Sequence, residues 1–189
     1  VPHIPLEIVG RIERAQKEAN AEVTVIEIGG TVGEYENILF LEAARILKLR
    51  APDAVRFVMV SYLPTPSNIG EMKTKPTQHS VRTLNASGIQ PDIIMARSQE
   101  PLDEKRKEKL SFFCNVPKEH VISAPDVNSI YDIPINFEKE GLSKLLAKLL
   151  HITFPAKKPA SGLAWKKMVS VVHNAKSEVR IAIVGKYFD

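Results

Sequence analysis

Apolar residues follow two patterns along the chain, short β-branched runs and longer stretches with helical spacing. Val23–Ile28 is β-branched at every position except Glu27. This pattern predicts a strand that is buried on both faces of a parallel sheet. Similar apolar runs predict strands at 55–61, 91–98 and 120–123.

Helical spacing of apolar residues predicts helices around and between these strands. The first helix opens at Pro5, which suits the first helical turn, and runs to Asn20. In 37–49 apolar residues wrap most of the helical circumference, which predicts a helix either deeply buried or half buried against a partner chain. The remaining helices are expected at 79–87, 102–114, 136–150 and 165–175.

The alternation of strands and helices predicts an α/β fold with a mostly parallel sheet, flanking helices and right-handed crossovers. Residues 1–152 form the expected main domain. Lysines and prolines at 154–161 mark a linker, and we assign 153–178 to a linker that contains one helix. An apolar run starts at Val179, so 179–189 is expected to be the first strand of a further domain.

Composition and charge narrow the function classes. The chain has 189 residues, of which 44% are hydrophobic and 25% are charged, as in ordinary globular domains. The net charge of +4 is mild, and basic residues do not cluster with aromatic ones, which argues against nucleic-acid binding. No apolar run reaches about 18 residues and no leader is visible, so we expect no membrane segment and a cytoplasmic location. Because the chain starts at Val1 without an initiator Met, we expect a piece of a longer protein.

The single cysteine and the histidines carry little chemistry. Cys114 is the only cysteine, so an internal disulfide is excluded. Its apolar setting, 110–115, favours a packed core thiol over a nucleophile. The five histidines are scattered without metal-ligand spacing.

The first candidate site residue is Glu27, one residue before the expected end of the first strand. A carboxylate there needs a bound cation or a lysine to offset its burial. A glutamate that only accepts hydrogen bonds from loop amides is the alternative. The loop that follows contains Gly29, Gly30 and Gly33, which permit positive φ angles and a close approach of backbone N–H groups to a ligand.

The second candidate site is the stretch from Lys73 to Gln78. Pro76 suits the first turn of a helix, so the free N–H groups of Thr77 and Gln78 are expected to point out beside Lys73 and Lys75. A helix N-terminus next to two lysines suits a polyphosphate. The alternative is a solvated lysine pair without function.

A third candidate, Lys109, lies on the helix expected at 102–114. With helical spacing it shares a face with Leu102, Arg106 and Phe113. Lys109 therefore either extends past this apolar stripe to water or reaches a bound phosphate.

Six segments of the chain stand out together by their order and spacing. They are Glu27–Gly33, Lys73–Val81, Gln90–Asp92, Phe113–Pro117, Asp126–Tyr131 and Val184–Tyr187. In this order and at these spacings they closely resemble CTP synthase. The resemblance extends over essentially the whole chain and looks like the later part of the amidoligase domain. It implies a P-loop NTPase-like (Rossmann-like) domain that lacks its P-loop segment, because no G-x-x-x-x-G-K-[ST] motif occurs here.

The resemblance implies an activity. In CTP synthases ATP phosphorylates O4 of UTP, and ammonia from glutamine displaces the phosphate to give CTP. Glutamine is hydrolysed in an attached class I amidotransferase domain, which would begin at 179–189 here. The implied cofactor is Mg²⁺, ATP is a co-substrate, CTP is a feedback inhibitor, and the implied assembly is a homotetramer with pyrimidine sites at subunit contacts. No nucleic acid or membrane partner is implied.

The resemblance also implies roles for single residues, and no catalytic side chain is assigned within this chain. Glu27 corresponds to a magnesium-binding carboxylate. Glu34, Tyr35 and Glu36 lie where the family contacts the CTP base and ribose and commonly has Asp-Ile-Glu. His3 lies in a segment that resembles one near the nucleotide site. The UTP and CTP site corresponds to Lys73, Thr74, Lys75, Pro76, Thr77, Gln78 and Lys109, and the adenine-contacting turn to Pro125, Asp126 and Val127.

A second function class fits the same motifs. The chain could represent a non-catalytic nucleotide-binding or assembly module that retains the pyrimidine site without the ATP machinery. In the family the P-loop and a second magnesium-binding Asp would precede Val1, and the glutaminase triad would follow Asp189. A P-loop encoded in frame upstream would favour the enzyme, and a true start codon near Val1 would favour the module.

Overall fold

The computed structural model describes residues 3–153 and 160–186. The chain divides into two compact units, Val1–Phe154 and Pro155–Asp189. Within the described residues, no helix has the length and apolar character that a membrane crossing requires.

A parallel sheet of three strands forms the centre of the first unit. The strand order is β1-β2-β3, and the register pairs Val60 with Met95 and Ala96 with Ser123. Parallel neighbours need long crossover connections, which helices provide here. The predicted α/β architecture with a parallel sheet is therefore confirmed, and it is consistent with a Rossmann-like fold. The strands are β1 (Val58–Tyr62), β2 (Ile93–Ser98) and β3 (Val121–Pro125).

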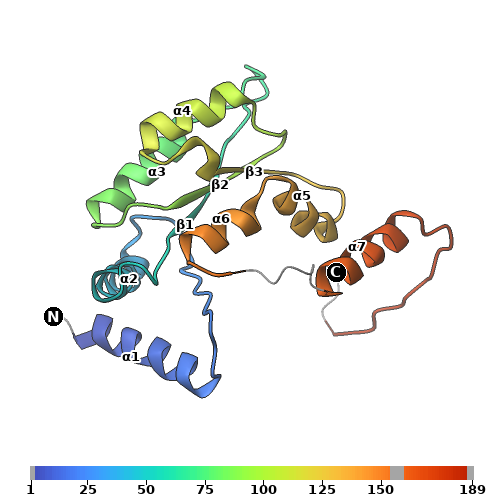
Figure 1. The fold of residues 1–189 in the computed structure, drawn as a ribbon. Coiled ribbons are helices and arrows are strands. Elements are labelled where there is room, and N and C mark those ends of the chain that lie inside the picture. The colour runs from blue at the N-terminus through green and yellow to red at the C-terminus, as the bar shows by residue number, and fades with distance from the viewer. Residues whose placement is uncertain (1–2, 154–159, 187–189) are drawn as a thin grey trace. The chain divides into compact units, whose positions relative to one another are not determined.

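Helices cover both faces of β2 (Figure 1). Ile94 and Ala96 face the helix pair that follows β1 and β2 in the chain. They share a core with Leu110 of α4 (Glu104–Cys114), the second helix of that pair. Ile93 faces the opposite pair and packs in a second core with Leu145. Successive side chains of a strand point to opposite faces, so both faces require apolar residues. The first pair is α3 (Lys75–Ala86) and α4 (Glu104–Cys114), and the second is α5 (Ile133–Lys139) and α6 (Leu142–Leu149).

The cover is incomplete over β1, which is the edge strand among the described residues. Met59, on the face of β1 that contacts α3, is buried in the core. Val58, Val60 and Tyr62, on the opposite face, are exposed. The second helix pair therefore does not extend over this edge of the sheet.

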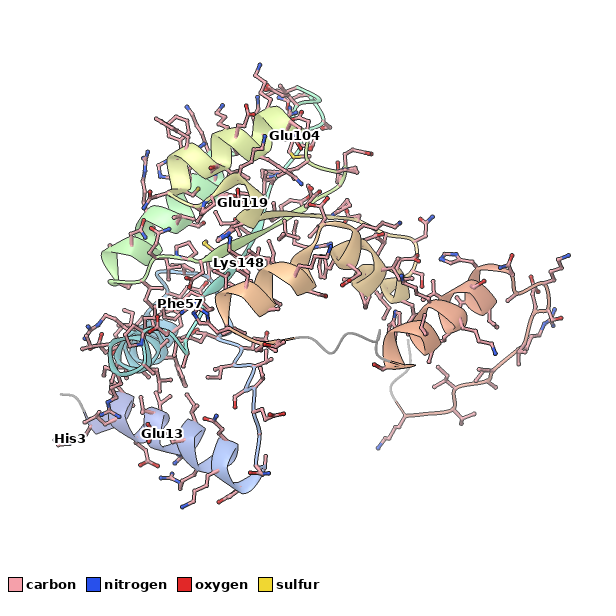
Figure 2. All side chains as sticks on the ribbon, viewed as in Figure 1. His3, Glu13, Phe57, Glu104, Glu119 and Lys148 are labelled. Atoms are coloured by element: carbon pink, nitrogen blue, oxygen red, sulfur yellow. The ribbon has the colours of Figure 1, made fainter. Side chains whose placement is uncertain are left out.

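Two further helices precede the sheet. α1 (His3–Glu18) packs against α2 (Ile38–Arg50), and Arg50 forms an ion pair of 3.7 Å with Glu13. Figure 2 shows Glu13 on α1, on the side that faces α2. Both helices lie close to their predicted positions. A short 3₁₀ helix, Tyr35–Asn37, leads into α2.

The first predicted strand is not formed. Val23–Ile28 forms neither helix nor strand, and Val25 is 92% exposed. β-branched residues favour a strand only where a neighbour supplies backbone hydrogen bonds and a packing surface. The prediction of a strand buried on both faces is therefore wrong for this structure.

Two predicted helices have different limits. α3 begins at Lys75, four positions before the predicted start at His79, with Thr74 as its N-cap. The helix predicted at 136–150 is divided into α5 and α6. Gly141, between them, has a φ angle of +80°, which is incompatible with a continuing right-handed helix.

The described part of the second unit, 160–186, contains one helix, α7 (Ala160–His173), which starts five positions before the predicted helix. Residues 174–186 form neither helix nor strand. The strand predicted from Val179 is therefore absent from the described residues, and Val184 is 94% exposed. The predicted linker segment at 154–159 and the chain end at 187–189 lie outside the described residues.

Candidate functional site

The three strands end at one edge of the sheet, and the backbone extends this edge. Leu63 N donates a hydrogen bond of 2.7 Å to Arg97 O, and Asp126 N donates one of 2.8 Å to Ser98 O. In open α/β sheets ligands bind beyond the carboxyl ends of the strands. The turn after β3 and the start of α3 both lie at this edge.

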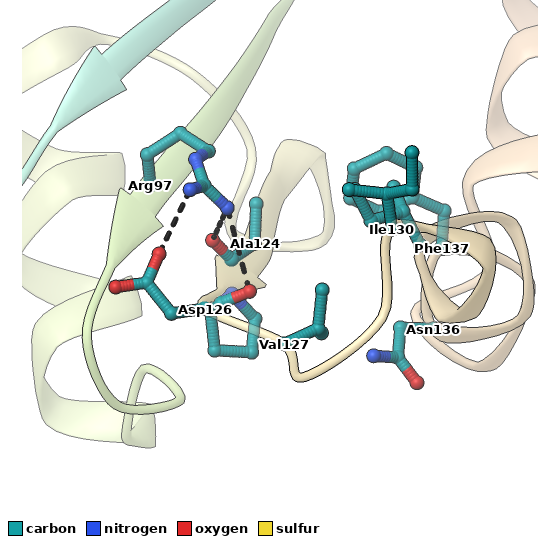
Figure 3. Close-up of a pocket in the computed structure, with 9 residues that line it drawn as sticks. Arg97, Ala124, Asp126, Val127, Ile130, Asn136 and Phe137 are labelled. Carbon is teal, nitrogen blue, oxygen red and sulfur yellow. Dashed lines mark hydrogen bonds and ion pairs between the residues drawn. The ribbon is translucent and has the colours of Figure 1, made fainter. Parts of the chain in front are cut away.

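A pocket with a volume of about 280 Å³ opens beside the turn after β3 (Figure 3). Its walls are largely aliphatic, with one aromatic ring and a few polar groups, which suits a flat heterocyclic ligand. All three residues predicted for the adenine-contacting turn line it. The lining consists of Arg97, Ala124, Pro125, Asp126, Val127, Ile130, Ile133, Asn136 and Phe137.

Arg97 holds the turn in place (Figure 3). Its Nη1 donates to the carbonyl oxygens of Ala124, at 3.1 Å, and Pro125, at 3.4 Å. Its Nη2 donates to Asp126 Oδ1 at 2.8 Å. The planar guanidinium therefore fixes three consecutive residues of the pocket wall. Sequence analysis did not single out Arg97, although a charged residue at the end of an apolar parallel strand points to this edge.

The start of α3 is held by buried polar side chains. Gln78 N donates to Thr74 O at 3.2 Å, and Gln78 Nε2 donates to Thr74 Oγ1 at 3.1 Å. The hydroxyls of Thr77 and Ser61 are 2.9 Å apart and join α3 to β1. The prediction of a free, outward N–H at Gln78 is therefore wrong, because this group donates the i→i−4 backbone hydrogen bond to Thr74 O at the start of the helix. Lys75 and Pro76 are exposed.

Two cationic side chains pair with one carboxylate next to this helix start, and the charge of a third acts on it. Lys73 Nζ is 2.6 Å from Glu71 Oε2, and Arg106 Nη2 is 3.9 Å from Glu71 Oε1. The hydrogen bond from Lys73 is the main cause that lowers the pKa of Glu71, and the charges of Arg106 and Lys109 lower this pKa further. We call Lys73, Arg106 and Lys109 the cation cluster. Lys109 is exposed and belongs to this cluster through the effect of its charge on the pKa of Glu71.

The glycine loop forms the predicted turn and packs on α3. Gly30 and Gly33 have φ angles of +84° and +98°. A Cβ atom at Gly33 would lie 2.9 Å from Thr83 Cγ2, and one at Gly30 would lie 2.8 Å from Glu34 Oε2. Both positions therefore require glycine. Glu34 Oε2 accepts a hydrogen bond of 3.0 Å from Thr31 N, and this backbone hydrogen bond lowers the pKa of Glu34.

Glu27 is exposed, contrary to the expectation of a buried acid. The reason is that the strand expected to bury it does not form. The carboxylate that a loop amide holds is that of Glu34. Among the residues that the structure describes, no group of three His, Cys, Asp or Glu side chains gathers as a metal site. Glu27 therefore offers one accessible oxygen ligand, and its metal-binding role stays a prediction.

The predicted site residues form separate groups. The cation cluster and the pocket share no residue. Tyr35 and Glu36 are exposed and precede α2 in the sequence. His3 is exposed at the start of α1 (Figure 2).

Cys114 is 1% exposed, and burial raises the pKa of its thiol to about 11. The prediction of a packed core thiol is confirmed.

This fold and this edge are those of an α/β domain of the nucleotide-binding type. Residues 1–152 match the family model described as the CTP synthase N-terminus. The chain is 48% identical to the CTP synthase of Thermococcus gammatolerans over 188 residues, which are 99% of this chain and 34% of that protein. It is 49% identical to the CTP synthase of Pyrococcus furiosus over the same shares. The CTP synthase of Methanococcus maripaludis is 45% identical over 190 residues, which are 100% of this chain and 35% of that protein.

The chain belongs to the CTP synthase family. It spans about a third of the length of the curated relatives that it matches. The match to the family's N-terminus corrects one expectation, because residues 1–152 are the N-terminal synthetase part and not the later part of the amidoligase domain.

Proposed function

We propose that the full-length protein to which this chain belongs aminates UTP to CTP with ATP and with ammonia from glutamine. Family membership supports the reaction. The observation that carries the proposal is the pairing of Lys73 and Arg106 with the carboxylate of Glu71 at the carboxyl edge of the sheet, where the charge of Lys109 also lowers the pKa of Glu71. A cation cluster at this edge suits the phosphates of a nucleotide.

The proposed ATP site is the pocket beside the turn after β3. Its apolar wall, with Val127 and Phe137, suits the adenine ring, and the backbone of Asp126 and Val127 supplies polar groups at its rim. Pro125 has no N–H, so it contributes only its carbonyl, which already accepts from Arg97. Arg97 is therefore a positioning residue for the proposed adenine site.

The proposed UTP site is the start of α3 together with Lys109. Its lysines neutralise and hold the triphosphate of UTP. Transfer of the γ-phosphoryl group of ATP to O4 of the uracil releases ADP. Ammonia then adds to C4 and loses a proton, and the bond from C4 to the phosphorylated oxygen breaks to release inorganic phosphate. Glu27 would hold Mg²⁺, which supplies neutralisation of phosphoryl charge when bound.

We further propose that the pyrimidine site is completed by a second copy of the chain. The exposure of Glu34, Tyr35 and Glu36 supports this arrangement. Exposed apolar residues of α2 directly after them, Ile38 to Phe40, support self-association. A homotetramer, feedback by CTP at this site, the amidotransferase domain from residue 179 and a cytoplasmic location stay predictions of the family resemblance.

Product analysis of the full-length protein tests this function. Purified protein is incubated with UTP, ATP and Mg²⁺, with either glutamine or ammonium as the nitrogen source, and the nucleotides are separated by chromatography. We expect CTP with both nitrogen sources. Binding of UTP without any CTP in the presence of ammonium would contradict the enzyme and favour the non-catalytic module.

A further inference from the structure

Glu71 is presented to the cation cluster by a closed loop. Between β1 and α3, Lys73 N donates to Pro64 O at 2.9 Å, and Gly70 N donates to Pro66 O at 2.9 Å. These hydrogen bonds join the two ends of the loop and form a turn within it. The loop therefore holds Glu71 directly before the proposed UTP-binding segment.

Arg106 fixes this loop to α4. Its Nε donates to Met72 O at 3.3 Å, and its guanidinium pairs with Asp103, whose side chain also caps the start of α4. Met72 itself is buried in the core. The backbone beside Glu71 is thus anchored, and only its side chain needs to move to break the contacts with the cations.

The side chain of Glu71 is well placed to exchange with a ligand. It is 59% exposed, and Lys73 is 36% exposed. Ion pairs between exposed groups are weak because water competes for both partners. A triphosphate carries several negative charges and makes stronger, charge-assisted hydrogen bonds to the same lysines. It would therefore displace a single carboxylate.

We propose that Glu71 is an internal counter-ion that occupies the cation cluster without nucleotide and is displaced when a nucleoside triphosphate binds. This inference rests on the proposed UTP site. The Lys73 contact and the lowered pKa of Glu71 support it, because the carboxylate is held in its charged form. Glu71 consequently sets the affinity for the triphosphate and leaves the recognition of the uracil unaffected.

Binding measurements on Glu71→Gln test the inference. The substitution keeps the size of the side chain and removes its charge, so the cations no longer have to be released and the carboxylate no longer repels the triphosphate. We expect UTP to bind to the full-length variant roughly twofold to tenfold more tightly than to the wild type by calorimetry. The affinity for uridine, which has no phosphate, should not change. Glu71→Ala should act in the same direction as Glu71→Gln.

A matched control separates this effect from net charge. Glu18→Gln changes the net charge by the same amount at the end of α1, and UTP affinity should stay at the wild-type value. Equal or weaker UTP binding by both Glu71 variants, with wild-type binding intact, would overturn the inference. Failure of the wild type itself to bind UTP would instead refute the proposed function.

Discussion

Two glutamates close together in the sequence have different environments. Glu34 is held in the glycine loop by Thr31 N, and its pKa is lowered by that hydrogen bond. Glu27 is exposed. Both carboxylates are exposed, but the Glu34 side chain is oriented by a loop amide, which binds one of its two oxygens. Their roles can therefore be separated by single substitutions.

Replacement of Glu27 by Gln tests the metal-binding role. Mg²⁺ prefers charged oxygen ligands, so we expect turnover of the full-length variant with ammonium to fall by orders of magnitude at ordinary magnesium concentrations. The thermal midpoint should hardly change, because Glu27 is exposed. The measurement is turnover across a magnesium titration.

Glu22→Gln serves as the control for Glu27→Gln, because Glu22 is exposed on the same segment. Its turnover should match the wild type. Near-normal turnover of Glu27→Gln at ordinary magnesium would remove Glu27 from the proposed metal site.

At the scale of elements, the start of α3 contains two kinds of residue. Buried polar residues stabilise the helix start, and accessible lysines are proposed to bind the triphosphate. Thr74, Thr77 and Gln78 are buried and tie the first turn to itself and to β1. Lys73 and Lys75 remain accessible at the same helix end. The motif therefore combines a buried, hydrogen-bonded helix start with two accessible charges, which suits an anion site.

Removal of these two lysines tests the proposed triphosphate site. We expect Lys73→Ala and Lys75→Ala in the full-length protein to weaken UTP binding by about 1–3 kcal/mol each, because each loses a charge-assisted hydrogen bond. Calorimetry gives the affinity, and uridine again serves as the ligand without phosphate. Unchanged UTP affinity in the double variant would contradict this role and would favour the alternative, a solvated lysine pair without function.

The turn after β3 gives a second prediction at this scale. Arg97→Ala removes the three hydrogen bonds that hold Ala124, Pro125 and Asp126. We expect the ATP affinity of the full-length protein to fall about tenfold or more, since each lost hydrogen bond costs on the order of 1 kcal/mol. UTP affinity should stay constant.

Arg11→Ala is the control for Arg97→Ala, because Arg11 pairs with a carboxylate on the surface of α1. It should leave the affinities for ATP and UTP unchanged. A loss of UTP affinity in Arg97→Ala equal to the loss of ATP affinity would indicate general unfolding of the edge and not a local role.

At the scale of the whole molecule, the described residues hold the sheet, the pocket and the cation cluster but leave apolar surface uncovered. The exposed face of β1 and the exposed apolar residues of α2 are examples. The sequence also contains no Walker A motif. The chain therefore carries the proposed recognition groups without a Walker A loop.

Residues 1–189 alone should not convert UTP to CTP, even with ATP, Mg²⁺ and free ammonium. The same chromatographic assay as for the full-length protein measures this, with that protein as the positive control. Detectable CTP from the isolated chain would show that phosphoryl transfer does not need a Walker A loop supplied from outside it.

Local sequence patterns alone established much of this protein. The order of helices and strands in residues 38–125 follows from apolar periodicity, because a helix and a buried strand each impose a spacing on the residues that face the core. The glycine turn follows from Gly30 and Gly33, which alone tolerate its φ angles. The family also follows from the sequence, because its motifs are read residue by residue.

Only the tertiary structure decided which residues meet. Glu22–Ile28 has strand composition yet lies outside the sheet, since pairing depends on a neighbouring strand and not on the segment itself. The contacts of Arg97 with the turn after β3, and of Arg106 with Glu71, join residues that are far apart in the sequence. Local propensity contains no information on such contacts, because they form only when the sheet brings its strand ends to one edge.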